Sequence, residues 1–92
     1  MEIAQLIKEA RHRSASAQKC LFDLLDDKMM LVCRRYVKSG EDTEEVLLDG
    51  FYKFVKNLTA FNFQGDAALC VWLKKIMINE CLMLLLLPVV FL

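Results

Sequence analysis

The scarcity of backbone breakers is the feature that most constrains how this chain folds. The 92 residues include three glycines, Gly40, Gly50 and Gly65, and a single proline, Pro88. Helix-favouring residues fill the stretches between them, and no two runs of alternating apolar and polar residues are placed to pair as strands. A chain of this length forms one small domain. We therefore predict an all-α fold, a compact bundle of about four helices.

Apolar residues that recur every three or four positions predict helices over residues 2–12 and 17–37, a third that starts with the E-D-T-E-E run at residue 41 and reaches Leu58, and a fourth over residues 67–86. Serine, threonine or aspartate at a helix start accepts a bond from a free backbone N–H, whereas glycine or proline ends a helix. The expected N-caps are Ser14 or Ser16, then Asp42 or Thr43, then Asp66, and the expected helix ends are Gly40 and Pro88. Gly50 lies inside the third helix, where it indicates either a close approach between helices or a tolerated weakness.

The same periodicity assigns apolar side chains to the core. The expected inward-facing residues are Ile3, Leu6, Ile7 and Ala10, then Cys20, Leu21, Leu24, Leu25, Leu31, Val32 and Tyr36, then Val46, Leu47, Phe51, Phe54, Val55 and Leu58, and finally Leu69, Trp72, Leu73, Ile76 and Cys81. All four cysteines, Cys20, Cys33, Cys70 and Cys81, are expected to be small reduced core residues. They form no C-x-x-C pair, and the chain has one histidine. We therefore expect no metal site and no cofactor.

Charge is unevenly distributed although it cancels overall, with 12 Lys and Arg against 12 Asp and Glu. All of it lies in residues 1–80, and residues 81–92 (CLMLLLLPVVFL) carry none. This apolar run is shorter than the roughly 20 residues of a membrane helix. The amino terminus lacks the apolar core of a signal peptide, so we expect a cytoplasmic protein. So large an apolar patch exceeds what a soluble monomer exposes, and it is expected to fold back, to pair two chains or to cause aggregation.

The sequence offers no phosphate-binding loop and no nucleophile paired with a base, and we expect the protein not to be an enzyme. Glu44, Glu45 and Asp49 stand at helical spacing beside a helix start. They are better interpreted as a solvated acidic face than as the paired carboxylates of an active site. The zero net charge also excludes a protein that coats long stretches of DNA. Any contact with nucleic acid is therefore local.

The segment that joins the third and fourth helices holds the residues best suited to a local contact. Aromatic faces stack unpaired bases, amides bond base edges and lysines bind phosphates. The candidate residues for binding single-stranded nucleic acid are Phe61, Asn62, Phe63, Gln64, Trp72, Lys74, Lys75 and Asn79. The alternative, which composition alone favours, is that Phe61 and Phe63 fill the gap between two helices.

Two long stretches, EDTEEVLLDGFYKFVKNL and FNFQGDAALCVWLKKIMINE, follow a recognisable order, and CRRYVKSGEDTEE precedes them. This order resembles the second region of bacterial RNA polymerase sigma factors, in particular the extracytoplasmic-function group. The matching positions are Val46, Leu47, Gly50, Phe51, Lys53, Lys56, Asn57, Leu58, Phe63, Gly65, Trp72, Leu73, Ile76 and Asn79. The resemblance covers roughly residues 3–84 and consists of many weak positions with consistent spacing.

The resemblance implies a transcription-initiation module with two binding surfaces. The first docks on the clamp helices of the polymerase beta-prime subunit, and its candidates are Asp42, Glu45, Leu48, Asp49 and Tyr52. The second holds a base of the melted minus-ten promoter element, on the non-template strand, after that base has left the stack. By position, Phe61, Asn62, Phe63 and Gln64 form the wall of this pocket, Asn79 reads a base edge, Lys74 and Lys75 contact phosphate, and Trp72 faces either the DNA or the core. An anti-sigma factor is a further partner that the resemblance implies.

The chain departs from the family pattern near its end. Leu85 and Leu86 stand where family members carry a basic segment that leads to a helix-turn-helix domain. We therefore expect a truncated form, with a region-2-like domain over residues 1–84 and an atypical apolar tail over residues 85–92. Full promoter recognition is not expected of it. The alternative functions are a helical protein-interaction module of other ancestry, whose apolar tail docks on a partner, and an inactive sigma fragment. Self-association through the tail is a further expected contact.

Overall fold

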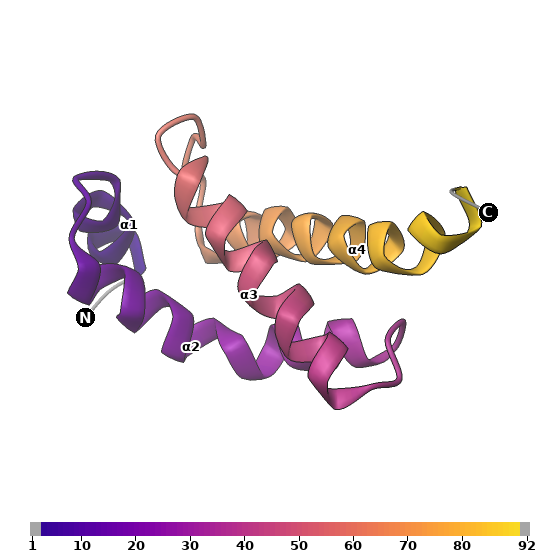
Figure 1. The fold of residues 1–92 in the computed structure, drawn as a ribbon. Helices are drawn as coiled ribbons and strands as arrows, with labels where there is room; N and C mark the ends of the chain where they lie inside the picture. The colour runs from indigo at the N-terminus through magenta and orange to yellow at the C-terminus, as the bar shows by residue number, and fades with distance from the viewer. Residues whose placement is uncertain (1–2, 91–92) are drawn as a thin grey trace.

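The structure is a computed structural model that describes the backbone of residues 3–90 and the side chains of residues 3–86. This part of the chain folds into four α-helices and contains no strand (Figure 1). The helices are α1 (Ile3–Arg11), α2 (Ala15–Arg34), α3 (Gly40–Lys56) and α4 (Asp66–Val90). The predicted all-α bundle of about four helices is confirmed.

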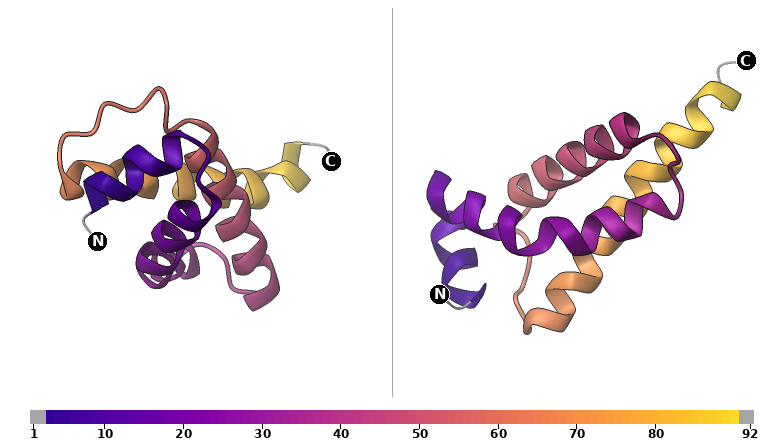
Figure 2. Two further views of the ribbon diagram at one scale, coloured as in Figure 1. Left: turned by 90° about the vertical axis from the view of Figure 1, so that its left-hand side faces the viewer. Right: turned by 90° about the horizontal axis from the view of Figure 1, so that it is seen from below.

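Helix α2 contacts each of the other three helices, and α3 also packs against α4. Helix α3 runs back beside α2 after a tight turn, and the carboxyl end of α4 extends beyond the other helices (Figure 2). A single hydrophobic core joins all four helices, and its fully buried members include Ile7, Leu21, Cys33, Phe54, Leu58, Leu69, Leu73, Met77 and Cys81. Each large apolar side chain removed from water in this way stabilises the fold by about 1.5–3 kcal/mol.

A continuous series of aromatic rings runs through this core toward the loop between α3 and α4. Phe22 of α2 lies 4.8 Å from Phe51 of α3, measured between ring centroids, and Phe51 lies 5.8 Å from Phe54. Phe54 contacts Trp72 of α4 at 5.4 Å, and Trp72 stacks on Phe61 of the loop at 4.3 Å. The loop is thereby packed directly against the core.

Gly50 marks a close approach between α3 and α4. A Cβ atom at Gly50 would lie 2.9 Å from Cε of Met77 and still nearer to its Sδ. Met77 is fully buried, so its thioether fills the space that a larger residue at position 50 would need. Of the two interpretations that the sequence left open for this glycine, the close helix–helix approach is the correct one.

The turn between α2 and α3 differs from the prediction. Gly40 does not end α2 in a left-handed conformation, because α2 has already ended and Gly40 is the first residue of α3. The N-cap is Ser39, whose side chain accepts a hydrogen bond from the N–H of Asp42. Thr43 lies inside the first turn, where its buried hydroxyl donates to the Ser39 carbonyl at 2.7 Å. The predictions that Asp42 or Thr43 caps α3 and that Gly40 ends α2 are therefore wrong.

The turn between α1 and α2 ends one helix and starts the next within a few residues. The N–H of Ser14 bonds the Glu9 carbonyl at 3.2 Å, and the N–H of Arg13 bonds the Ala10 carbonyl at 3.0 Å. This pair of bonds is a Schellman motif, which requires a left-handed residue that is usually glycine; Arg13 adopts it with φ of 65°. The Ser14 hydroxyl then accepts from the N–H of Ala17, which confirms Ser14 as the N-cap of α2.

Helix α4 is longer than predicted at both ends. Asp66 is its first residue, and Gly65 before it supplies the carbonyl that accepts from the N–H of Leu69 at 3.1 Å. The φ of Gly65 is +106°, a conformation that glycine adopts without steric cost. The helix also continues through Pro88 to Val90, so the prediction that Pro88 ends it is wrong. Proline removes one hydrogen bond to the preceding turn, while the leucines before it are strong helix formers.

The buried face of α2 is narrower than predicted. Core contacts use residues spaced by four, namely Ala17, Leu21, Leu25, Met29 and Cys33. Several residues expected to face inward are exposed instead, namely Cys20, Leu24, Leu31 and Tyr36. The prediction combined two adjacent columns of apolar residues on α2. Because neighbouring helix positions point about 100° apart, only one of these columns reaches the core. For the same reason Cys20 is not a core cysteine, while Cys33 and Cys81 are buried and Cys70 is half-buried.

Candidate nucleic-acid interface

A shallow pocket lies between the loop of residues 57–65 and the first turns of α4. Its volume is about 530 Å³, and it is lined by Asn57, Ala60, Phe61, Asn62, Gln64, Ala68, Trp72 and Ile76. Four predicted site residues, Phe61, Asn62, Gln64 and Trp72, therefore share one pocket. Phe63 is not among the lining residues, and its half-buried side chain packs against the core.

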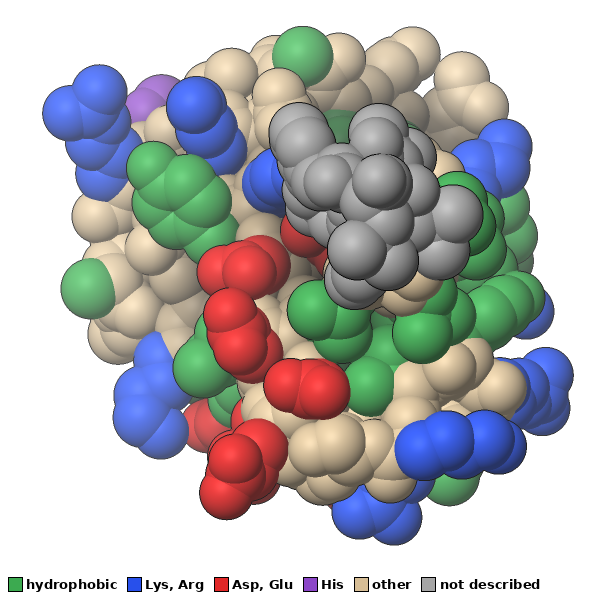
Figure 3. All heavy atoms as spheres, turned by 45° about the vertical axis from the view of Figure 1, so that its right-hand side comes forward, with side chains coloured by type: hydrophobic (Ala, Val, Ile, Leu, Met, Phe, Trp, Pro, Cys, Tyr) green, Lys and Arg blue, Asp and Glu red, His purple; other side chains and the backbone are tan. Residues whose placement is uncertain are grey.

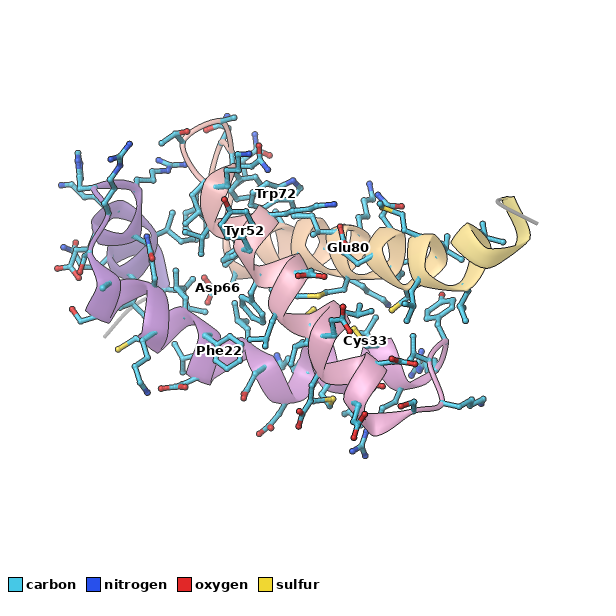
Figure 4. All side chains as sticks on the ribbon, in the orientation of Figure 1. Phe22, Cys33, Tyr52, Asp66, Trp72 and Glu80 are labelled. Atoms are coloured by element: carbon cyan, nitrogen blue, oxygen red, sulfur yellow. The ribbon has the colours of Figure 1, made fainter. Side chains whose placement is uncertain are left out.

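The aromatic wall of the pocket is built on Trp72. The rings of Phe61 and Trp72 are nearly parallel, with an interplanar angle of 8°, whereas Phe54 meets Trp72 at 48°. Trp72 is half-buried between these two phenylalanines and lies on α4 beside α3 (Figure 4). A base cannot use the Trp72 face that Phe61 covers unless it displaces Phe61. The face of Phe61 turned away from Trp72 has no aromatic partner among the described residues.

Three amide side chains surround this aromatic wall. Asn57 is the C-cap of α3, and its Nδ2 donates to the Lys53 carbonyl at 2.8 Å, which leaves Oδ1 as an acceptor. Asn62 and Gln64 are exposed, and neither amide bonds to another described group. An amide carries both donor and acceptor atoms. The pocket therefore offers an aromatic face together with the two kinds of hydrogen-bonding group that read a base edge.

The remaining predicted residues of this interface lie on α4. Since an α-helix turns about 100° per residue, Asn79 lies within about 20° of Trp72 around the helix axis and Lys75 within about 60°. Both are exposed, so they lie on the side of α4 that carries the pocket. Lys74 lies about 160° from Trp72 on the same geometry. Lys75 and Asn79 therefore share the side of α4 that carries the pocket, but neither lines it, and Lys74 lies on another side.

Sequence reasoning missed half of the pocket lining. Ala60 and Ala68 contribute small side chains that leave the space open, and Ile76 was assigned to the core. Asn57 gave the one available signal, because an amide stood at the end of the third helix immediately before the loop. The fold brings these residues together because the loop doubles back, which sequence spacing alone does not reveal.

The second predicted surface lies on the exposed side of α3. Asp42, Glu45, Leu48, Asp49 and Tyr52 are all exposed, and they fall within about 120° around the helix axis. Leu48 is 59% exposed and Tyr52 69%, so two large apolar or aromatic side chains stand among three carboxylates. On the face shown in Figure 3, acidic side chains gather into one patch next to hydrophobic ones. By exposure and helical spacing, the predicted polymerase-contacting residues share one side of α3, the α3 stripe.

An ion pair that the sequence did not predict joins α3 to α4. Lys53 Nζ contacts Glu80 Oε1, and the Glu80 side chain is only 10% exposed while that of Lys53 is 46% exposed. Glu80 lies on α4 beside α3 (Figure 4). Lys53 is thereby paired within the protein.

Two thiols meet between α2 and α4, away from this pocket. Burial, with a smaller contribution from the neighbouring Cys81, raises the pKa of Cys33 to about 12. Burial also raises the pKa of Cys81. Both thiols are therefore protonated at neutral pH, and a protonated buried thiol is a structural group rather than a nucleophile.

Comparison with known proteins supplies no relative for this chain. No family model, curated protein or solved structure matches it. Among the described side chains, no group of three or more His, Cys, Asp or Glu residues is placed to hold a metal ion. Within residues 3–90, no helix has both the length and the apolarity that crossing a membrane requires.

Proposed function

We propose that this chain is a sigma-factor region-2-like module that acts in transcription initiation in the bacterial cytoplasm. In this proposal the loop pocket binds a base of the melted minus-ten element, and the exposed stripe of α3 contacts the clamp helices of the polymerase beta-prime subunit. The observation that carries the proposal is the pocket itself, in which the aromatic series ends at Phe61 among the amides of Asn57, Asn62 and Gln64.

The pocket suits a single unpaired base better than a duplex. Taking a base out of the stack costs a few kcal/mol, and stacking on an aromatic side chain returns about 1–3 kcal/mol per base. Phe61 supplies the stacking face, and the amides of Asn62 and Gln64 reach the base edge. Lys75 and Asn79 then follow the strand along α4. With so few cations involved, the affinity should depend only weakly on salt, with a slope of about −0.7 for each phosphate contact to a single strand.

The α3 stripe suits a basic and partly apolar protein partner. Its carboxylates favour association with a positively charged surface, and Tyr52 and Leu48 provide side chains that an interface can bury. Tyrosine is enriched among residues that dominate binding energy. Because this stripe lies on α3 and the pocket on the loop and α4, both partners can bind at the same time.

The DNA-binding part of the proposal is tested with a fluorescently labelled single strand and the purified chain. Phe61→Leu removes the stacking face and is expected to weaken binding by about tenfold or more, the change that corresponds to one lost stacking contact. Phe22→Leu is the matched control, because it makes the same substitution at another half-buried ring that contacts one aromatic partner outside the pocket. Equal affinities for wild type and both variants would contradict the proposal.

The exposed apolar side chains of α4 support a second candidate function, a protein-interaction module. Leu82, Met83, Leu85 and Leu86 are between 39% and 54% exposed, so these residues do not fold back onto the bundle. A chain that associates through them and binds neither single-stranded DNA nor the clamp helices would belong to this second class or be an inactive sigma fragment.

A further inference from the structure

Arg11, at the end of α1, contacts the loop that forms the pocket. Its Nε donates to the Leu58 carbonyl at 2.9 Å, and its Nη2 donates to the Phe61 carbonyl. These two acceptors lie 47 and 50 residues further along the chain. The guanidinium therefore joins the carbonyls at the two ends of the loop's first turn, Leu58 and Phe61, and Phe61 is the residue that stacks on Trp72.

The loop has few other bonds that fix this turn. Between residues 57 and 61 the backbone bonds are local, from the N–H of Ala60 to Asn57 and from the N–H of Phe61 to Leu58. Leu58 is fully buried, so its carbonyl is a fixed point, whereas Phe61 lies at the start of an irregular segment. A bond to the Phe61 carbonyl from a residue on another helix restricts the position of the Phe61 ring directly.

We propose that Arg11 is a positioning residue for the pocket, holding Phe61 stacked on Trp72 and thereby keeping the pocket in its binding shape. The part of this inference that concerns DNA rests on the function proposed above. Arginine suits the role because its planar guanidinium presents several donors in a fixed geometry, whereas lysine carries one compact ammonium group on a flexible stem. Arg11→Lys should therefore keep the charge and lose the two-point contact.

Three variants separate positioning from charge. Arg11→Gln removes both the positive charge and the two-point contact, whereas Arg11→Lys removes the two-point contact alone. Lys8→Gln is the control, because it removes one charge from an exposed residue of the same helix that has no bond to the loop among the described groups. Trp72 is the single tryptophan of the chain, so quenching of its fluorescence by acrylamide reports on the Phe61 stack. We expect quenching to increase in both Arg11 variants and to stay unchanged in Lys8→Gln.

Affinity for the labelled single strand supplies the second measurement. Both Arg11 variants are expected to bind about tenfold more weakly, the ratio that corresponds to one lost charge-assisted hydrogen bond. If Arg11 acts by positioning, the salt dependence of binding stays at the wild-type slope. A direct phosphate contact would instead lower that slope by about 0.7 in Arg11→Gln and preserve it, with the affinity, in Arg11→Lys.

The outcomes distinguish this inference from the function it builds on. Unchanged Trp72 quenching in both Arg11 variants, or a loss of affinity in Arg11→Gln that Arg11→Lys fully restores, overturns the positioning role. Circular dichroism shows which variants are folded, and if Arg11→Gln unfolds, Arg11→Lys decides the question by the same two measurements. A wild-type chain that binds no single strand contradicts the proposed function, while the quenching result still tests Arg11.

Discussion

The ion pair between Lys53 and Glu80 gives a sharp quantitative prediction, because its two members differ in exposure. Glu80 is nearly buried against α3, and Lys53 reaches the solvent with about half of its side chain. Lys53→Met keeps the length of the side chain but leaves the Glu80 carboxylate without its cation. The same contact joins α3 to α4.

The expected loss of unfolding free energy in Lys53→Met lies between two limits. Removing one partner of a fully buried pair costs about 3–5 kcal/mol, whereas an exposed pair contributes about 0–1 kcal/mol. With one partner desolvated and the other half in water, we expect Lys53→Met to lower the free energy of unfolding by about 2 kcal/mol. Glu80→Gln should cost less, about 1 kcal/mol, because the ammonium left behind can be solvated. The double variant should cost about 2 kcal/mol, which corresponds to a coupling energy of about 1 kcal/mol.

Urea unfolding followed by far-ultraviolet circular dichroism measures all four proteins of this cycle. The control is the pair formed by Lys19 and Asp23 along α2, whose side chains are 76% and 58% exposed. Lys19→Met should cost less than about 0.5 kcal/mol. If Lys53→Met costs no more than Lys19→Met, then Glu80 is not desolvated, and the account of how α3 is fixed on α4 is wrong.

Further predictions concern the backbone, the thiols and the end of α4. Arg13→Gly should raise the free energy of unfolding by about 1 kcal/mol, because arginine at φ of 65° carries a steric cost that glycine lacks. Gly65→Ala should lower the free energy of unfolding by about 1 kcal/mol or more, because alanine is strained at the positive φ of Gly65. Urea midpoints equal to that of the wild type would contradict both predictions. Exposed Cys20 should react with a thiol reagent well before buried Cys33 and Cys81. Because burial raises the pKa of Cys33 from its ordinary 9.0 to about 12, the folded protein should be destabilised as pH rises from 9 toward 12, where the unfolded state loses that proton first, and Cys33→Ala should reduce this dependence. Finally, the exposed side chains of α4 should cause self-association that Leu82→Gln combined with Leu86→Gln reduces; light scattering that gives a monomer mass for both proteins would exclude it.

Most of the fold could be predicted from the sequence because helical periodicity is a local signal. The inward faces of α3 and α4 followed from residues spaced by three and four, and Phe54, Leu58, Leu69 and Leu73 are buried as expected. The same signal failed on α2, where two neighbouring columns of apolar residues compete and only packing against the other helices selects one. Helix ends were harder still. The sequence favoured Asp42 or Thr43 as the cap of α3, whereas the Ser39 hydroxyl accepts from the N–H of Asp42 and the Thr43 hydroxyl donates to the Ser39 carbonyl.

The candidate site was predictable only in part, for a related reason. Aromatic and amide residues in the loop identified the segment, and three of them, Phe61, Asn62 and Gln64, share a pocket with Trp72. Their arrangement depends on contacts between distant parts of the chain. The Phe61–Trp72 stack, the lining by Ile76 and the bonds from Arg11 each join residues that sequence spacing leaves unrelated. Lys74 and Lys75 are adjacent in sequence, yet the helix directs them to different sides of α4.

The central claim, that this chain is a sigma-factor region-2-like module, is tested most directly by binding to the isolated clamp helices of a bacterial polymerase beta-prime subunit. The purified chain should bind them, and Leu48→Lys should abolish binding while leaving single-stranded DNA binding intact. Leu31→Lys is the matched control, because Leu31 is a similarly exposed leucine on α2, outside the α3 stripe. Absence of clamp binding by the wild-type chain, or equal loss in both variants, would contradict the claim.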